Sequence, residues 1–118
     1  WVKANKCIIE DKINENECQA LPTVIKIEER YHMYFCYRHM LGFREDKTKA
    51  YRLGYAYSDD LITWIRDDNN MGIIKEKNSW DSDMMCYPNI FEVNDDVYLL
   101  YNGNEFGKCG FGLAKLDL

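Results

Sequence analysis

Two carboxylates, Glu17 and Asp83, stand at matching places in the chain and could perform acid–base chemistry. Glu17 lies five residues before Pro22, and Asp83 lies five residues before Pro88. Two carboxylates can share the work of proton transfer when a fold brings them to one site. We therefore predict Glu17, as a general acid, and Asp83 as catalytic residues, with Asp81 or Asp83 holding substrate groups. The alternative is that they are turn or cap residues ahead of a strand.

The matching places belong to an internal repeat. Residues 22–38 overlay residues 88–104 without a gap at an offset of 66. Residues 53–56 then overlay residues 111–114 at an offset of 58, so a loop is shorter in the second copy. Differences of this kind belong in loops. A period of this length indicates a repeated supersecondary unit.

The alternation of residue types predicts that each unit is built of β-strands. In residues 51–58, large aromatic and aliphatic side chains alternate with mostly small ones, which is the period of a strand. Residues 31–37 form an apolar run that fits a strand buried on both faces or a buried helix; the β-rich composition and the flanking turns favour the strand. Each full unit then has four strands, predicted at residues 23–27, 31–37, 51–58 and 62–66. Four-stranded units repeated around an axis are the blades of a β-propeller.

We therefore predict one all-β domain over residues 1–118, a partial β-propeller of about two antiparallel blades. Residues 22–66 form a complete blade, residues 88–118 form three strands of the next, and residues 1–3 form the last strand of a preceding blade. That last assignment rests on the likeness of Trp1-Val2-Lys3 to residues 64–66. A closed ring needs about four to eight blades. Because unpaired edges attract further strands, we expect either a homo-oligomer or missing blades of a longer chain.

Several strings in the chain are similar to a known group of proteins. They are YHMYFCYR (31–38), YRLGYAYSDDLITWIRDD (51–68), WDSDMMCYPNIF (80–91) and YNGNEFGKCGFGLA (101–114). They resemble the last blades of five-bladed β-propeller glycosidase-like proteins, relatives of glycoside hydrolase families 43 and 32. The resemblance implies a five-bladed parent whose inner-strand carboxylates act on a glycosidic bond, one protonating the leaving oxygen while another activates water or attacks the sugar. Because such carboxylates are spread over several blades, this chain is not expected to be catalytically complete alone.

A sugar substrate also needs polar and aromatic contacts. Arg38 and Asn104 form a second matched pair just past the second strands, and an arginine fork can hold a carboxylate or two hydroxyls. Trp80 and Tyr87 flank the start of an inner strand, where a ring could stack on a sugar. We predict six substrate-binding residues: Arg38, Trp80, Asp81, Tyr87, Asn102 and Asn104.

Structural alternatives exist for several of these residues. Arg38 could instead form a salt bridge to Glu45 or Asp46 in the acidic loop that follows it. Asn102 precedes a glycine, and Asn-Gly is typical of a tight turn, which we favour over a ligand contact there. Trp64 is predicted to pack between blades.

Composition narrows the partners and cofactors. The net charge of -5 argues against a nucleic-acid partner, because phosphate binding needs clustered Lys and Arg. No apolar stretch approaches the roughly 18 residues of a membrane span, and we expect no membrane partner. Five cysteines without a CxxC pair or a His-rich cluster argue against zinc and for reduced thiols in the cytoplasm, although the missing initiating Met leaves removal of a signal peptide open. No cofactor motif occurs.

Two function hypotheses follow. The first is a glycosidase-like propeller fragment that takes part in carbohydrate binding or glycoside hydrolysis by paired carboxylates in the parent architecture, with an oligosaccharide or glycoside as partner. The alternative is a non-catalytic propeller module for glycan or protein binding or for assembly. Whether the chain is an enzyme depends on carboxylates that the missing blades would supply.

Overall fold

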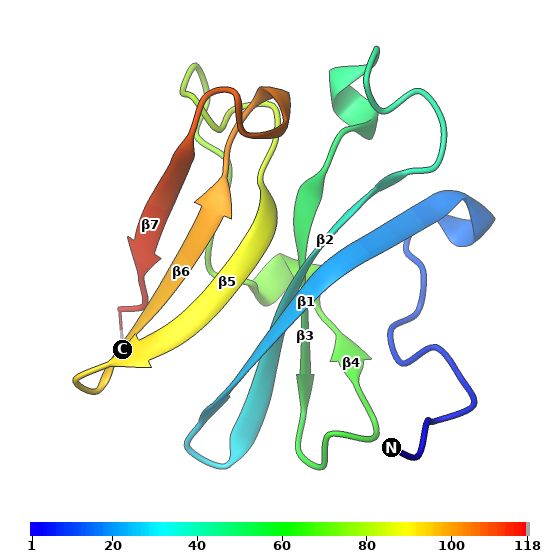
Figure 1. Cartoon of the computed structure of the whole chain (residues 1–118), viewed down its shortest axis with the longest axis vertical. Coiled ribbons are helices and arrows are strands. Elements are labelled where there is room, and N and C mark those ends of the chain that lie inside the picture. Colours follow the sequence, from blue (N-terminus) through cyan, green and yellow to red (C-terminus); the bar gives the residue numbers. More distant parts are fainter. Residues whose placement is uncertain (118) are drawn as a thin grey trace.

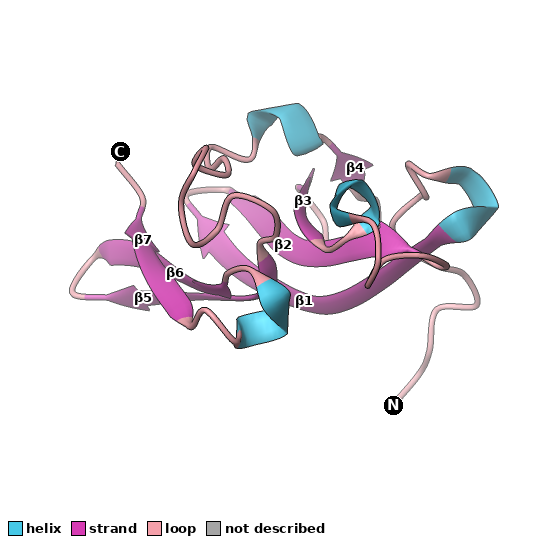
Figure 2. Cartoon of the chain, turned by 90° about the horizontal axis from the view of Figure 1, so that it is seen from above, coloured by secondary structure: helices cyan, strands magenta, loops and turns pink. Residues whose placement is uncertain are grey.

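The computed structural model describes residues 1–117, apart from the side chain of Glu15, and the chain is all-β, as predicted (Figures 1 and 2). The first sheet has the order β1-β2-β3-β4 and the second has the order β5-β6-β7, with antiparallel neighbours throughout. The strands are β1 (Glu17–Ile27), β2 (Arg30–His39), β3 (Arg52–Ser58), β4 (Ile65–Arg66), β5 (Cys86–Val93), β6 (Asp96–Asn102) and β7 (Phe111–Lys115). Short 3-10 turns occur at η1 (Asn14–Asn16), η2 (Lys47–Lys49), η3 (Asp68–Asn70) and η4 (Glu105–Gly107). Among the described residues, no helix has the length and hydropathy needed to cross a membrane.

The first strand of each sheet carries a β-bulge at the same place. The register shifts after Ala20 in β1 and after Cys86 in β5. Leu21 and Tyr87, which lie in the two bulges, have positive φ angles of 51° and 53°. A proline follows each of them, and prolines in sheets are confined to edges and bulges because they donate no ladder hydrogen bond. β1 begins at Glu17, ahead of the predicted strand at residues 23–27, and pairs with β2 on both sides of the bulge.

The fourth strand is shorter than predicted because side chains bind the backbone that precedes it. Asp60 Oδ1 accepts from the N–H groups of Ile62 and Thr63, each at 2.8 Å. Ser58 Oγ accepts from the N–H of Leu61 at 2.9 Å. These donors are therefore used in a turn rather than in a ladder, and only Ile65–Arg66 pairs with β3.

Residues 1–3 form no strand in the described chain. The preceding blade that they were predicted to complete is outside this chain, so their pairing stays a prediction.

Two apolar clusters lie on opposite sides of the first sheet. The cluster between the sheets draws on β2, β3, the loop before β5, β5 and β6; its buried members include Cys36, Leu53, Met84, Met85, Cys86, Leu99 and Tyr101. The second cluster lies on the far face of the first sheet and contains Ile9, Met33, Phe35, Tyr37 and Ala56, with Ile13 and Trp64 packed against it. Thr23 links the sheets directly, because its Oγ1 accepts from the N–H of Ile90 at 3.1 Å.

Glycines at equivalent positions let aromatic rings lie against both sheets. A Cβ added to Gly54 would lie 2.4 Å from Phe35 Cζ, and one added to Gly112 would lie 2.6 Å from Trp80 Cζ2. Gly54 is paired with Phe35, and Gly112 with Tyr101, in the same relative register. A larger residue at either position would displace the ring that covers it.

Candidate functional site

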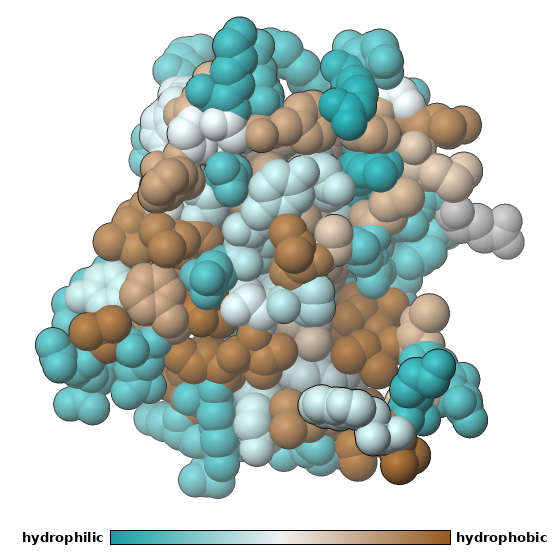
Figure 3. Space-filling view, viewed as in Figure 1, coloured by the Kyte–Doolittle hydropathy of each residue, from teal (hydrophilic) through white to brown (hydrophobic). Residues whose placement is uncertain are grey.

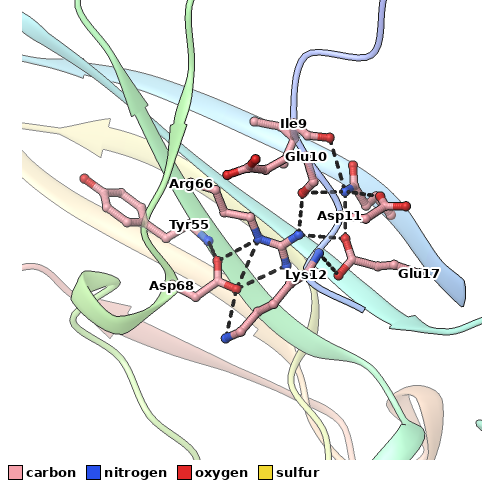
Figure 4. A network of polar contacts seen from close by, with 9 residues as sticks. Ile9, Glu10, Asp11, Lys12, Glu17, Tyr55, Arg66 and Asp68 are labelled. Carbon is pink, nitrogen blue, oxygen red and sulfur yellow. Dashed lines mark hydrogen bonds and ion pairs between the residues drawn. The ribbon is translucent and has the colours of Figure 1, made fainter. Parts of the chain in front are cut away.

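Glu17 begins β1 and lies in a buried network of charges (Figure 4). Its Oε2 accepts from Arg66 Nη1 and from Gln19 Nε2, each at 2.7 Å, and its Oε1 accepts from the backbone N–H of Lys12 at 3.1 Å. Arg66 Nη2 also lies 3.1 Å from Asp68 Oδ2. The Glu17 side chain is 0% exposed. Both of its oxygens therefore already have protein donors.

Arg66 is the centre of this network. Its guanidinium lies over the rings of Tyr37 and Phe35, at 4.5 Å and 5.1 Å from their centroids, and Nη1 donates to the backbone carbonyl of Glu10 at 2.8 Å. Burial opposes its charge, but hydrogen bonds to Glu17 and to a second carboxylate outweigh burial and raise the pKa of Arg66. The cation thus stays charged while it holds β1, β4 and the N-terminal segment together.

Asp83 lies in a more open place, in the loop that leads into β5. Its Oδ2 pairs with Lys47 Nζ at 3.0 Å, and its side chain is 35% exposed. The nearby backbone is fixed by the N–H of Met85, which donates to the carbonyl of Tyr51. The hydrogen bond to Asp83 and the charge of this carboxylate raise the pKa of Lys47.

Aromatic rings meet at Tyr51, whose backbone carbonyl accepts from the N–H of Met85, two residues after Asp83. Tyr51 lies edge-on to Tyr87, with centroids 5.4 Å apart, and to Phe106 at 6.1 Å. Phe106 in turn meets Phe43 at 6.0 Å. We call these rings the mouth cluster, together with the arginine that lies over Phe43 and the carboxylate in the loop held to Tyr51: Arg38, Phe43, Tyr51, Asp83, Tyr87 and Phe106.

Arg38 joins the mouth cluster through stacking and not through a salt bridge. Its guanidinium lies 3.8 Å from the ring centroid of Phe43, and Nη1 donates to the carbonyl of His39 at 2.9 Å. No ion pair of Arg38 occurs among the described residues, so the alternative bridge to Glu45 or Asp46 is not found. Asp46 instead accepts from the backbone of η2. Arg38 Nε is buried and has no partner among the described residues.

Asp81 is buried, with 3% exposure, and is held by Tyr101, whose hydroxyl donates to Oδ2 at 3.0 Å. Burial and the hydrogen bond to Asp81 raise the pKa of Tyr101 to about 12. Trp80 stacks on Tyr101, with centroids 5.5 Å apart, and keeps 37% exposure. Of these neighbours, Trp80 is the one that a solvent-borne ligand can reach.

Asn104 fixes this loop. Its Oδ1 accepts from the N–H groups of Asp83 and Met84, at 2.8 Å and 3.0 Å, and its Nδ2 donates to Ser79 and Ser82. These contacts use the side chain fully, so Asn104 positions the loop.

Asn102 does not begin a tight turn. It is the last residue of β6, paired with Cys86 and Phe111, and residues 103–110 connect it to β7. The favoured Asn-Gly turn is therefore wrong, because strand pairing on both sides holds Asn102 extended.

The structure brings Arg38 and Tyr87 to the ring of Tyr51, with Asp83 in the loop held to the backbone of the same residue, but leaves Glu17 apart. Glu17 pairs with Arg66, which lies over rings of the far cluster, whereas Asp83 lies in the loop that enters the second sheet. The equivalent places of the two carboxylates in the repeat thus put them in different blades, with the first sheet between them. Their catalytic roles, and the substrate-binding roles of the other six residues, stay predictions.

Sequence reasoning missed several residues that build the site. Arg66 and Lys47 hold the two candidate carboxylates, and Tyr101 holds Asp81. A basic residue inside a predicted strand was the available signal for Arg66. Among the described residues, no group of His, Cys, Asp and Glu is arranged to hold a metal ion.

No protein-family model matches the chain. Two curated proteins of Mycobacterium tuberculosis, uncharacterized protein MT1551 of strain CDC 1551 and uncharacterized protein Rv1502 of strain H37Rv, are each 33% identical to it over 117 residues. The match covers 99% of this chain and 36% of each relative. The chain therefore spans about a third of the length of the relatives it matches.

Solved structures share the fold at lower identity. Zg3597, a family 117 glycoside hydrolase of Zobellia galactanivorans, aligns with a TM-score of 0.67 and 17% identity over 89% of this chain and 36% of its own. A thermostable family-43 glycoside hydrolase aligns with a TM-score of 0.62 and 17% identity over 86% of this chain and 33% of its own. A further glycoside hydrolase aligns with a TM-score of 0.66 and 16% identity over 98% of this chain and 32% of its own. The chain thus has a glycosidase-like β-propeller fold, present in part and similar to about one third of these glycoside hydrolases.

Proposed function

We propose that this chain forms part of the wall of a carbohydrate site in a glycosidase-like propeller, with the mouth cluster as its contact surface. One observation carries the proposal. Of the three candidate carboxylates, Asp83 has a side chain 35% exposed, whereas Glu17 has a side chain 0% exposed and Asp81 is buried. Asp83 also lies in the loop whose backbone is held to Tyr51 of the mouth cluster by the N–H of Met85. A carboxylate accepts from sugar hydroxyls, and aromatic side chains provide flat apolar surface, so the combination suits a sugar.

We propose binding, and not hydrolysis, as the contribution of this chain by itself. Glycoside hydrolysis needs two carboxylates on either side of the scissile bond, about 5 to 10 Å apart. Glu17 lies on the other side of the first sheet, where Arg66 and Gln19 occupy its oxygens. A second carboxylate for Asp83 would come from parts of the propeller that this chain does not contain.

The proposal is tested by measuring glycan binding to the purified chain and to the full-length gene product that carries it. A panel of neutral and acidic oligosaccharides is screened by calorimetry or by saturation-transfer NMR. We expect Asp83→Asn to weaken binding about tenfold, as loss of a charged hydrogen-bond partner does. Asp59→Asn is the matched control, because Asp59 is an exposed carboxylate that pairs with Arg30 on the hairpin side of the first sheet.

Two results would count against the proposal. If neither protein bound any oligosaccharide of the panel, a carbohydrate site in this chain would be excluded. If the Asp83 and Asp59 variants bound equally well, the site would not include Asp83. Hydrolysis of aryl glycosides by the 118-residue chain, abolished by Glu17→Gln, would show that the chain is catalytic by itself.

A second candidate function is a module for assembly, and exposed apolar residues on the second sheet favour it. Phe111 and Leu113 of β7 are 74% and 58% exposed. We also propose a cytoplasmic location, because all five cysteines of the described chain are unpaired thiols, as reducing compartments favour.

A further inference from the structure

Three of the five arginines in the chain form no ion pair among the described residues, and these three lie close together in the sequence. Arg30 and Arg66 pair with carboxylates, whereas Arg38, Arg44 and Arg52 do not. The stretch from Arg38 to Arg52 carries five Lys or Arg and two Asp or Glu, in a chain whose net charge is -5. It is therefore a local concentration of positive charge.

This stretch lies at one end of the two sheets. Figure 1 shows the loop after β2, with η2, and the loop after β6, with η4, at the same end of the molecule, at the top of the view. In Figure 3, which keeps that view, hydrophilic side chains stand at this end with hydrophobic ones between them.

Lysines offset most of the carboxylates at this end, so the excess positive charge remains on arginines. The ion pairs are Lys47–Asp83 at 3.0 Å, Lys49–Asp46 at 4.0 Å and Lys108–Glu105 at 3.5 Å. Glu45 is exposed and forms no ion pair among the described residues. One carboxylate thus stands against the unpaired arginines.

One edge of the Arg38 guanidinium has no acceptor among the described residues. Its Nη1 donates to the carbonyls of His39 and Met40, at 2.9 Å and 3.4 Å. On the opposite edge, Nε is buried without a partner, and Nη2 has no hydrogen bond within the described part of the chain. The N–H groups of Nε and Nη2 are parallel, which is the geometry that holds a carboxylate by two hydrogen bonds. A ligand oxygen that enters at Nη2 could therefore also satisfy Nε, whose burial without an acceptor is unfavourable.

Arg38 lies on the face of the first sheet that meets the second sheet. It continues the alternation of Tyr34 and Cys36 along β2, and both belong to or pack against the cluster between the sheets. Its guanidinium lies over Phe43 at 3.8 Å and over Tyr51 at 5.5 Å. The surroundings of its free edge are therefore built by the two blades that this chain contains.

Arg44 brings a second cation to the same rings. Its guanidinium lies 5.1 Å from the centroid of Phe43 and 5.0 Å from that of Phe106. Arg44 is exposed, whereas Arg38 is half-buried. Stacking on aromatic faces orients both guanidiniums. A ligand in solvent can thus contact Arg44 while it approaches the free edge of Arg38.

We propose that Arg38 and Arg44 bind an anionic group, a carboxylate or a sulfate, carried by the glycan that occupies the mouth cluster. Arg38 donates from Nε and Nη2 to two oxygens of this group, and Arg44 attracts it from the solvent side. Asp83 accepts from the hydroxyls of the sugar, since Lys47 offsets its charge. The inference rests on the proposed carbohydrate site and specifies the class of its ligand as acidic glycans.

The test measures the binding of matched oligosaccharides to the full-length gene product that carries this chain. Each backbone of the panel is used in three forms: neutral, with a carboxylate at C6, and with a sulfate ester at C6. We expect at least one anionic form to bind about tenfold more tightly than the neutral form, as a charged hydrogen-bond partner provides. The carboxylate and sulfate arms identify the anion, and an aspartate-rich peptide serves as an anionic ligand without sugar.

Arg38→Lys separates the guanidinium fork from the charge. Lysine keeps the cation but lacks the parallel N–H groups, so we expect this variant to lose most of the preference for the anionic form and to keep its affinity for the neutral form. Arg52→Lys is the matched control, because Arg52 belongs to the same stretch but lies over Tyr37, in the cluster on the far face of the first sheet. It should leave the preference unchanged.

Arg44→Gln tests the second cation at an exposed position, where the fold does not depend on the side chain. We expect the preference to fall about two- to fivefold, as loss of an exposed ion pair does. Circular dichroism verifies that each variant is folded.

Equal affinity for the neutral and anionic forms would overturn the inference and leave the carbohydrate site in place. That result is also expected if a carboxylate elsewhere in the full-length protein already pairs with Arg38. A preference that Arg38→Lys and Arg52→Lys reduce alike would show attraction by net charge and would overturn the inference as well. Tighter binding of the peptide than of every oligosaccharide would make the two arginines a contact for a protein. If no oligosaccharide bound at all, the carbohydrate site itself would be excluded, and the inference with it.

Discussion

Replacement of Arg66 by methionine tests whether the network around Glu17 is held by this one cation. Arg66 is 5% exposed at its side chain, and the two carboxylates it pairs with, Glu17 and Asp68, are 0% and 6% exposed. Methionine keeps most of the volume over Tyr37 and Phe35 but removes the charge. Glu17 is then left buried without its cation, whereas Asp68 keeps Lys12, whose Nζ lies 3.5 Å from Oδ2. Removal of one partner from a buried ion pair costs about 3–5 kcal/mol. We expect Arg66→Met to lower the free energy of unfolding by that amount.

The assay is urea unfolding followed by tryptophan fluorescence. With a slope of about 1–3 kcal/mol per molar urea, the loss moves the midpoint by about 1–5 M. Arg30→Met is the matched control, because the Arg30–Asp59 pair is 50% and 70% exposed and water screens it. Glu17→Gln, which keeps the hydrogen-bond acceptor, should fall between the two. If Arg66→Met lost no more stability than Arg30→Met, the network would not be stabilised by charge pairing.

Three further predictions concern the second sheet and the tyrosines buried near it. Gly112→Ala places a Cβ 2.6 Å from Trp80 Cζ2, so we expect a loss of about 1–3 kcal/mol by overpacking, seen as a lower Tm; an unchanged Tm would contradict the close approach. Asn104→Ala removes the acceptor for two backbone N–H groups, so we expect it to lower the free energy of unfolding by about 1–3 kcal/mol and to speed hydrogen exchange in residues 79–85. Unchanged protection of these residues would show that Asn104 does not hold the loop. Burial raises the pKa of Tyr34 to about 12 and, with Asp81, that of Tyr101 to about 12. Between about pH 10 and pH 12 the unfolded chain therefore loses protons that the folded chain keeps, so stability should fall as pH rises through this range, which urea unfolding at about pH 9 and about pH 11 measures. Equal stability at the two pH values would show that both tyrosines ionise freely.

The sequence alone was sufficient for the fold class because strand signals are local. Alternation over residues 51–58 and the turn residues between apolar runs predicted antiparallel strands, and seven strands form two sheets. The overlay of residues 22–38 on 88–104 also predicted which strands are equivalent, and the bulges at Leu21 and Tyr87 follow the same offset. The strand ends were less predictable, since Asp60 and Ser58 bind the backbone that would otherwise have extended β4.

For the candidate site, too, one part follows from the sequence and the other depends on the tertiary structure. Residue type and repeat position selected Glu17 and Asp83 as equivalent carboxylates, and that much follows from the sequence by itself. The tertiary structure decided which of them faces solvent: Arg66 reaches Glu17 from β4, whereas Asp83 pairs with the exposed side chain of Lys47. Repeat position fixes the side of a sheet on which a residue lies, but the partner that a side chain meets there comes from distant parts of the chain, and local sequence carries no information about it.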